Sequence, residues 1–191
     1  MRDAVRDTVI VNLFGEPGAG KSTGAAYVFA MLKMNGIDAE LATEFAKDKL
    51  WEESKAVFEN QSYIFGKQSF RLSRCKGKVD VIVTDSPILL SVIYDGNSED
   101  TVKHDTFANY VFDVFESFTN KNYFLTRVKP YNSNGRFQTE EEAGEIGCEI
   151  RDMLDNFGVE YSCKDGFIDG YNEIVNEIIE IVSSKKEAKE V

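Results

Sequence analysis

Short apolar runs alternate with longer segments of helical periodicity along the 191 residues. Residues 8–14 (TVIVNLF) are β-branched or apolar at nearly every position, as in a strand buried on both faces of a parallel sheet. Residues 79–84 and 123–126 repeat this pattern, and residues 37–42 alternate more, which predicts a strand nearer the edge. A short run at residues 159–163 brings the predicted total to about five strands.

The segments between these runs have apolar positions at helical spacing. The predicted helices cover residues 22–34, 55–75, 104–118, 139–156 and 167–183. Alternating strands and helices require crossover connections, which are nearly always right-handed, so we expect an α/β fold with helices on both faces of a parallel sheet. We predict a single domain over residues 1–183 and a polar, frayed tail over residues 184–191.

Composition narrows the class of protein. The chain is 42% hydrophobic and 29% charged, as in ordinary globular proteins, and its net charge of −11 repels polyanions and acidic membrane surfaces. Duplex nucleic acid is therefore disfavoured as a partner without being excluded, whereas a homo-oligomer is compatible with the sequence. Three widely spaced cysteines and one histidine predict free thiols, and the charged N-terminus predicts a cytoplasmic protein that does not enter a membrane.

One glycine-rich motif lies between the first predicted strand and the first predicted helix. The stretch GEPGAGKST matches the phosphate-binding pattern G-x-x-x-x-G-K-[ST] without a mismatch. Glycines let backbone N–H groups turn around a phosphate, and the following helix directs its positive end to the same place. The predicted nucleotide-binding residues are Gly15, Glu16, Pro17, Gly18, Ala19, Gly20, Lys21, Ser22 and Thr23.

A P-loop of this kind is completed by a magnesium ion and an acidic residue. Lys21 would contact the β- and γ-phosphates, and the hydroxyl of Ser22 would bind Mg²⁺. Asp85 closes the buried run VDVIVTD and is the predicted second metal ligand. An aspartate that merely opens the turn before Ser86 and Pro87 is the alternative reading.

The remaining motifs favour a kinase over other P-loop proteins. Residues 120–123 (NKNY) lack the aspartate of the guanine-reading motif, and the chain has no room for the helical domain of hexameric ATPases. Residues 127–138 (RVKPYNSNGRFQ) follow a strand and carry three cations, which predicts a lid over the transferred phosphoryl group. Arg127 and Arg136 are its predicted catalytic residues, and an ordinary solvated loop is the alternative.

A kinase also needs a group that orients or deprotonates the acceptor hydroxyl. Glu44 follows the second predicted strand, at the sheet edge that also carries the P-loop, and is the predicted base. A surface glutamate at the start of a helix is the alternative. Asp38 and Asp48 remain rivals for this role. On the predicted helix 55–75, Gln68 and Arg71 share a face that either reads an acceptor or is solvated. Tyr63, Phe65 and Phe70 either stack on a base or belong to the core.

Several motifs in order resemble the nicotinamide riboside kinase-type P-loop family, whose members include many phage-encoded proteins labelled AAA-type ATPases. The resemblance covers residues 8–180. The motifs are GEPGAGKST, TEFAKD at residues 43–48, FGKQSFR at residues 65–71, VIVTDSP, and Pro130 followed by Asn134-Gly135-Arg136. The family usually has Asp-Gly before its lid arginine, so Asn134 is a departure that leaves the acceptor open.

The resemblance implies a five-stranded P-loop kinase core that uses ATP and Mg²⁺ to phosphorylate a nucleoside- or nucleotide-like acceptor. It implies Glu44 near the acceptor, Asp85 near the metal and Arg136 in the lid. Two alternatives stay open. One is a kinase acting on a hydroxymethylated pyrimidine in phage DNA or on a nucleic-acid end, and the other is an ATP-binding regulatory module with little turnover.

Overall fold

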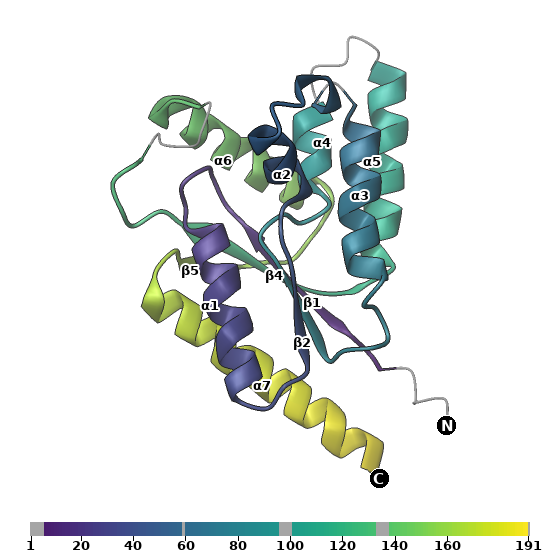
Figure 1. Ribbon diagram of the computed structural model, residues 1–191, viewed down its shortest axis with the longest axis vertical. Helices are drawn as coiled ribbons and strands as arrows, with labels where there is room; N and C mark the ends of the chain where they lie inside the picture. The colour runs from purple at the N-terminus through teal and green to yellow at the C-terminus, as the bar shows by residue number, and fades with distance from the viewer. Residues whose placement is uncertain (1–5, 59, 96–100, 133–137, 191) are drawn as a thin grey trace.

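A computed structural model describes residues 6–58, 60–95, 101–132 and 138–190. Its five strands form one parallel sheet in the order β2-β3-β1-β4-β5, with helices on both sides (Figure 1). The strands are β1 Val9–Phe14, β2 Ala39–Ala42, β3 Val81–Thr84, β4 Thr119–Thr126 and β5 Ser162–Asp165. The predicted α/β fold is thereby confirmed, and β1 occupies the centre of the sheet.

Two apolar clusters hold the helices against the two faces of the sheet. The helices are α1 Lys21–Met34, α2 Phe45–Trp51, α3 Gln61–Ser73, α4 Leu90–Asp95, α5 Thr101–Glu116, α6 Glu140–Asn156 and α7 Ile168–Glu190, with a 3₁₀ turn at Lys55–Val57. Val11 and Leu13 of β1 face the cluster shared with α1 and α7, whereas Ile10 and Phe14 face the cluster shared with α3, α4, α5 and α6. Both faces are covered, which explains why β1 is apolar at nearly every position.

The predicted boundaries differ from the structure in the middle of the chain. Helices α2 and α4 were not predicted, and the predicted helix 55–75 is interrupted before α3. The interruption has a local cause, because the side chain of Asn60 accepts a hydrogen bond from Tyr63 N and so begins a new helix. The helix predicted at residues 104–118 extends from Thr101 to Glu116 instead.

The bounds of the last two strands and of the last helix also differ from the predicted ones. The strand predicted at residues 123–126 begins earlier, at Thr119 of β4, and β5 begins three residues later than predicted. Helix α7 continues to Glu190 rather than ending at Ser183. Two ion pairs hold the end of α7 to the residues just before β1 and β3. Lys185 pairs with Asp7 at 2.6 Å, and Lys186 pairs with Asp80 at 3.1 Å.

Buried amides support the polar beginning of β4. The Nδ2 atom of Asn12 donates to the Oδ1 atoms of Asn120 and Asn122, each at 2.9 Å. These two amides in turn donate to the backbone, Asn120 to the carbonyls of Phe115 and Phe118, and Asn122 to the carbonyl of Glu160. The amino half of β4 can therefore be polar and still belong to a central region of the sheet.

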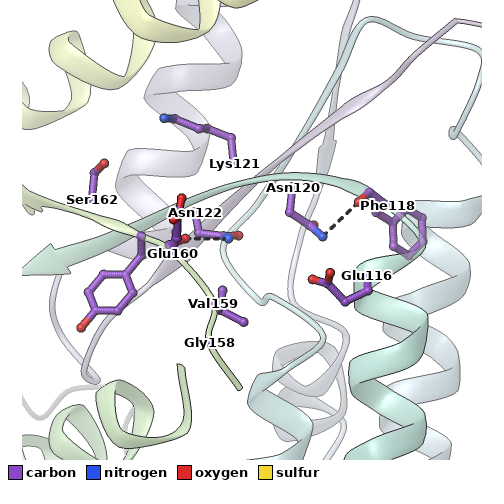
Figure 2. Close-up of a pocket in the computed structure, with 10 residues that line it drawn as sticks. Glu116, Phe118, Asn120, Lys121, Asn122, Gly158, Val159, Glu160 and Ser162 are labelled. Carbon is purple, nitrogen blue, oxygen red and sulfur yellow. Dashed lines mark hydrogen bonds between the residues drawn. The ribbon is translucent and has the colours of Figure 1, made fainter. Parts of the chain in front are cut away.

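A polar pocket of about 630 Å³ opens beside these amides (Figure 2). Its lining comes from the end of α5, the amino half of β4 and the segment that leads into β5, namely Glu116, Phe118, Asn120, Lys121, Asn122, Gly158, Val159, Glu160, Tyr161 and Ser162. Because the strands are parallel, this pocket lies at the opposite edge of the sheet from the P-loop. The amides that Figure 2 shows bonded to Phe118 and Glu160 stabilise this junction.

Two properties of the described residues bear on the composition. No helix among them is long and apolar enough to cross a membrane. Cys75, Cys148 and Cys163 are free thiols, as predicted.

Candidate functional site

The glycine-rich loop leaves β1 with a backbone that only glycine adopts comfortably. Gly15, Gly18 and Gly20 have φ angles of 140°, 87° and 92°. A Cβ atom on Gly20 would also lie 2.4 Å from the hydroxyl oxygen of Tyr171. That hydroxyl lies within hydrogen-bond distance of two carbonyl oxygens, Gly20 O at 2.9 Å and Gly166 O at 2.8 Å. Tyr171 belongs to α7, so this helix holds the end of the glycine-rich loop in place.

The N-terminus of α1 has no side-chain cap on its first backbone N–H groups. Its N-cap is Gly20, no side chain caps it, and its first turn contains no acidic residue. The first N–H groups of a helix have no partners within the helix, and the helix dipole is positive there. The loop and α1 together form the arrangement that binds phosphate groups in proteins.

Lys21 lies over this loop. Its Nζ atom donates to the carbonyl oxygens of Gly15 at 2.7 Å and of Glu16 at 3.0 Å. The ammonium group is thus held at the mouth of the loop, where a phosphate would face it. Ser22 and Thr23 follow in the first turn of α1 and are exposed.

Asp85 sits directly after β3 and is only 7% exposed. Its Oδ1 atom is buried and has no hydrogen-bond partner among the described residues. A buried carboxylate oxygen without a partner is costly unless a cation or water completes it. The donor set of Asp85 and the Ser22 hydroxyl fits Mg²⁺, which takes oxygen ligands and keeps several waters. No cluster of three or more potential metal-binding side chains occurs in the described ranges, so the protein would supply few ligands.

Glu44 occupies the N-cap position of α2, immediately after the carboxyl end of β2. Burial raises the pKa of its carboxyl group above the usual range, and the neighbouring Asp85 carboxylate raises it further. The charge of Lys21 acts in the opposite direction. Asp85 and Lys21, which lie far from Glu44 in the sequence, are therefore close enough to it in space to affect its pKa.

One further residue, Tyr94 of α4, lies near Glu44 without having been predicted. Loss of solvent around its phenol raises the pKa of Tyr94 to about 12, although the residue as a whole is 44% exposed, and the carboxylates of Glu44 and of Glu149 from α6 contribute to the shift. The electrostatic environment of Tyr94 thus joins α2, α4 and α6. Tyr94 lies on a helix missed for its shortness, and nothing in the sequence distinguishes Glu149 from the other acids of α6.

The two rivals of Glu44 have other environments. Asp38 precedes β2, at the amino edge of the sheet, and forms an ion pair with Arg6. At about 3.3 Å per extended residue, six positions place its Cα about 20 Å from that of Glu44. Asp48 accepts a hydrogen bond from Arg71 at 2.6 Å on the exposed side of α2.

Arg127, the first cation of the predicted lid, connects the P-loop to α6. It donates to Glu16 Oε1 and to Glu140 Oε1, each at 2.7 Å, and these bonds raise its pKa. Its guanidinium group also lies 5.3 Å from the ring centroid of Tyr131, whose ring covers Gly18 of the P-loop. The base of the lid therefore touches the phosphate-binding loop directly.

The structure describes only some of the other residues of the predicted lid. Arg136 lies outside the described residues. Lys129 lies 4.2 Å from the ring centroid of Phe167, in the segment that follows β5. Tyr131 donates from its hydroxyl to the carbonyl of Gln138 at 2.7 Å, which joins the two ends of the segment that contains Arg136.

The candidate acceptor contacts on α3 differ in burial: some are buried and others are exposed. Gln68 is buried, and its Oε1 atom accepts a hydrogen bond from Phe45 N at 3.0 Å, which fixes the start of α2 beside Glu44. Phe65 belongs to the core, whereas Tyr63 is 43% exposed and Phe70 is 64% exposed. The aromatic residues of this helix therefore serve two different faces.

Comparisons with solved structures give the fold a precedent. The chain resembles the NadR protein in complex with NAD and AMP-PNP, with a TM-score of 0.67 and 14% identity over 93% of this chain and 50% of that one. It also resembles deoxyadenosine kinase from M. mycoides with bound dATP, with a TM-score of 0.51 and 21% identity over 93% and 99% of the two chains. For thymidylate kinase from Ehrlichia chaffeensis, the TM-score is 0.55 and the identity 13% over 92% and 98%.

These likenesses establish a fold, and the chain spans about half the length of the NadR protein. No curated protein matches the sequence. A family model described as an AAA domain matches residues 10–164, from β1 into β5. The match includes the glycine-rich loop, Glu44, Asp85 and Arg127, and it covers most of the chain, so this protein belongs to that AAA domain family.

Proposed function

We propose that this protein transfers the γ-phosphoryl group of ATP to a hydroxyl group of a nucleoside- or nucleotide-like acceptor. The observation that carries the proposal is the grouping of Lys21, Asp85 and Glu44 around an uncapped helix N-terminus. The three residues supply a phosphate contact, a metal ligand and a base. The nucleotides bound in similar solved structures, AMP-PNP with NadR and dATP with deoxyadenosine kinase, support this choice of ligand.

The triphosphate would lie along the loop of residues 15–23. Backbone N–H groups of the loop and of the first turn of α1 would bind its oxygens, with Lys21 at the β- and γ-phosphates. Ser22 and Asp85 would hold Mg²⁺, which when bound neutralises phosphate charge. Asp85 is suited to this part because burial leaves its Oδ1 without any other partner among the described residues.

Glu44 would accept the proton of the acceptor hydroxyl. In the transfer, the bond between the γ-phosphorus and the bridging oxygen breaks, a bond from the γ-phosphorus to the acceptor oxygen forms, and ADP leaves. The hydroxyl proton passes to the Glu44 carboxylate. A raised pKa suits this role, because a base is most effective when its pKa approaches the working pH.

Arg127 and Arg136 would counter the charge that develops on the moving phosphoryl group. Arg127 already lies at the P-loop but is held by Glu16 and Glu140. Phosphate oxygens compete for the same guanidinium donors, since arginine pairs equally well with carboxylate and phosphate. We infer that nucleotide binding redistributes these bonds of Arg127.

The test is a transfer assay with ATP, magnesium and a panel of nucleosides and nucleotides. At least one acceptor should be phosphorylated, and Lys21→Ala should reduce its rate by about 10²- to 10³-fold. Lys33→Ala is the matched control, because Lys33 is exposed in the last turn of the same helix. Binding of ATP without stimulation by any acceptor would overturn the proposal and favour a regulatory module.

A further inference from the structure

The outer face of α3 carries aromatic and cationic side chains in alternation. Tyr63, Lys67, Phe70 and Arg74 are all exposed, and their spacing of four, three and four residues aligns them on one face of the helix. We call these four residues the α3 stripe. The stripe extends about 16 Å at 1.5 Å per residue, which is long enough for a few nucleotides.

The segment that carries the stripe has a charge opposite to that of the whole molecule. Residues 60–79 contain five lysines and arginines and no aspartate or glutamate, although the chain has 33 acidic residues and a net charge of −11. The acids of neighbouring α2 are engaged locally, since Asp48 pairs with Arg71 and Glu52 pairs with Lys49. A polyanion approaching this acidic protein would be attracted to this face.

A glycine in the middle of α3 flattens the same face. Gly66 lies three residues after Tyr63 and four residues before Phe70, and a Cβ atom there would meet nothing within 4 Å. Glycine inside a helix costs about 1 kcal/mol relative to alanine, and no packing contact in the described structure requires it at this position. Its presence is explained if another molecule approaches the helix backbone closely between the two aromatic rings.

The inner face of the same helix positions the candidate base. Gln68 binds the backbone N–H of Phe45, and the guanidinium of Arg71 donates to the carbonyl oxygen of Thr43 at 2.7 Å. Tyr63, at one end of the stripe, lies 5.7 Å from Phe45 between ring centroids. The stripe therefore begins beside the residue that follows Glu44 and continues away from the site (Figure 1 shows α3 adjoining α2).

We propose that the α3 stripe binds single-stranded nucleic acid. Exposed rings stack on bases of any sequence, and interleaved cations pair with the phosphates between them, which is the pattern of single-strand binding surfaces. The rings need unstacked bases, which a single strand offers and a paired duplex does not.

The position of the stripe suggests that the bound strand supplies the phosphoryl acceptor. A strand lying on it with one end at Tyr63 would present its terminal nucleotide near Glu44. The acceptor hydroxyl would then belong to the end of a nucleic acid. This part rests on the proposed phosphoryl transfer, whereas binding to the stripe does not.

Binding is tested by fluorescence anisotropy with a labelled oligothymidylate of about 15 nucleotides, without ATP and with a chelator, so that the result does not depend on catalysis. At about 50 mM salt, we expect a dissociation constant of about 10⁻⁶ to 10⁻⁴ M. Phe70→Leu keeps the apolar volume but removes the ring, and should weaken binding by about tenfold. Lys67→Glu and Arg74→Glu should weaken binding and make it less sensitive to salt, by about 0.7 in the slope of log K against log salt for each lost phosphate contact.

Lys33→Glu is the matched control, since it makes the same charge change on α1, on the opposite face of the sheet. It should bind as the wild type does, and circular dichroism should show that all variants are folded. No binding by the wild type at low salt would overturn the proposal. Wild-type affinity in Phe70→Leu, or an equal loss in Lys33→Glu, would also overturn it, because the first excludes stacking and the second indicates a response to net charge alone.

Discussion

Helices α1 and α6 begin in opposite ways, although both follow a loop at the carboxyl edge of the sheet. The N-terminus of α6 is satisfied by its own side chains, because Thr139 caps Glu142 N while Glu142 accepts a hydrogen bond from Thr139 N. The first turn of α6 carries three acidic residues, whereas that of α1 carries none and has glycine at the N-cap.

The difference shows where the protein tolerates unsatisfied backbone donors. A cap contributes about 1 kcal/mol to stability, and α6 has one where stability is all that is needed. At α1 the chain forgoes a cap, keeps acids out of the first turn and holds Lys21 against the loop. This is the expected arrangement if an anion completes the helix terminus.

The largest effect is expected from Asp85, the proposed metal ligand. Asp85→Asn should reduce phosphoryl transfer by about 10²- to 10³-fold, because a metal ligand is lost. It should not lower the free energy of unfolding, because the buried Oδ1 atom of Asp85 has no hydrogen-bond partner among the described residues and the carboxylate lies near Glu44. Initial rates and urea denaturation measure the two quantities. Asp152→Asn, an exposed position on α6, is the control, and a variant that keeps its rate but loses stability would make Asp85 structural.

A second variant gives α1 the charge that α6 already has. Thr23 is the third residue of α1, as Glu142 is the third residue of α6. Thr23→Glu should stabilise the nucleotide-free protein by about 0.3–1 kcal/mol through the helix dipole. It should weaken ATP binding by about tenfold through charge repulsion, as measured by calorimetry. Thr23→Gln separates charge from size, and equal losses in both variants would contradict this explanation.

Removing the cap of α6 should lower stability and leave nucleotide binding unchanged. Thr139→Ala should lower the free energy of unfolding by about 1 kcal/mol, since it leaves Glu142 N without its side-chain acceptor. The KM for ATP should not change in transfer assays. A change in KM without a change in stability would show that the start of α6 belongs to the nucleotide site.

The smallest expected effect is a shift in pH dependence. The charge of Lys47 lowers the pKa of Glu44, so Lys47→Gln should raise that pKa. If Glu44 must be deprotonated to act, the acid limb of the kcat/KM profile moves to higher pH. Lys33→Gln should leave the limb in place, and a shift to lower pH in Lys47→Gln would exclude Glu44 as the titrating base.

The sequence predicted the parts of the site that are determined locally. The loop of residues 15–23, the strand before it and the helix after it are contiguous, and the spacing of their residues reports their geometry directly. Asp85 was proposed as a metal ligand in the same way, from its place at the end of a buried run. Short elements were missed because the six residues of α4 and the seven of α2 provide too few positions for a helical period to be recognised.

Contacts between distant segments could not be read from the pattern. The pairing of Arg127 with Glu16 and Glu140 joins residues 111 and 13 positions apart, and nothing in the chain marks these two acids among 33. The two faces of α3 were likewise left open, because the exposure of Phe70 and the burial of Phe65 depend on how the helix is turned toward α5. Tertiary packing decided these features.

The central claim is that the N-terminus of α1 and its loop bind a nucleoside triphosphate. Isothermal titration calorimetry of the wild type with magnesium-loaded ATP tests it directly. The account predicts a saturable heat of binding with one site per chain, which Lys21→Ala loses and Lys33→Ala retains. The absence of heat with both ATP and GTP would contradict it.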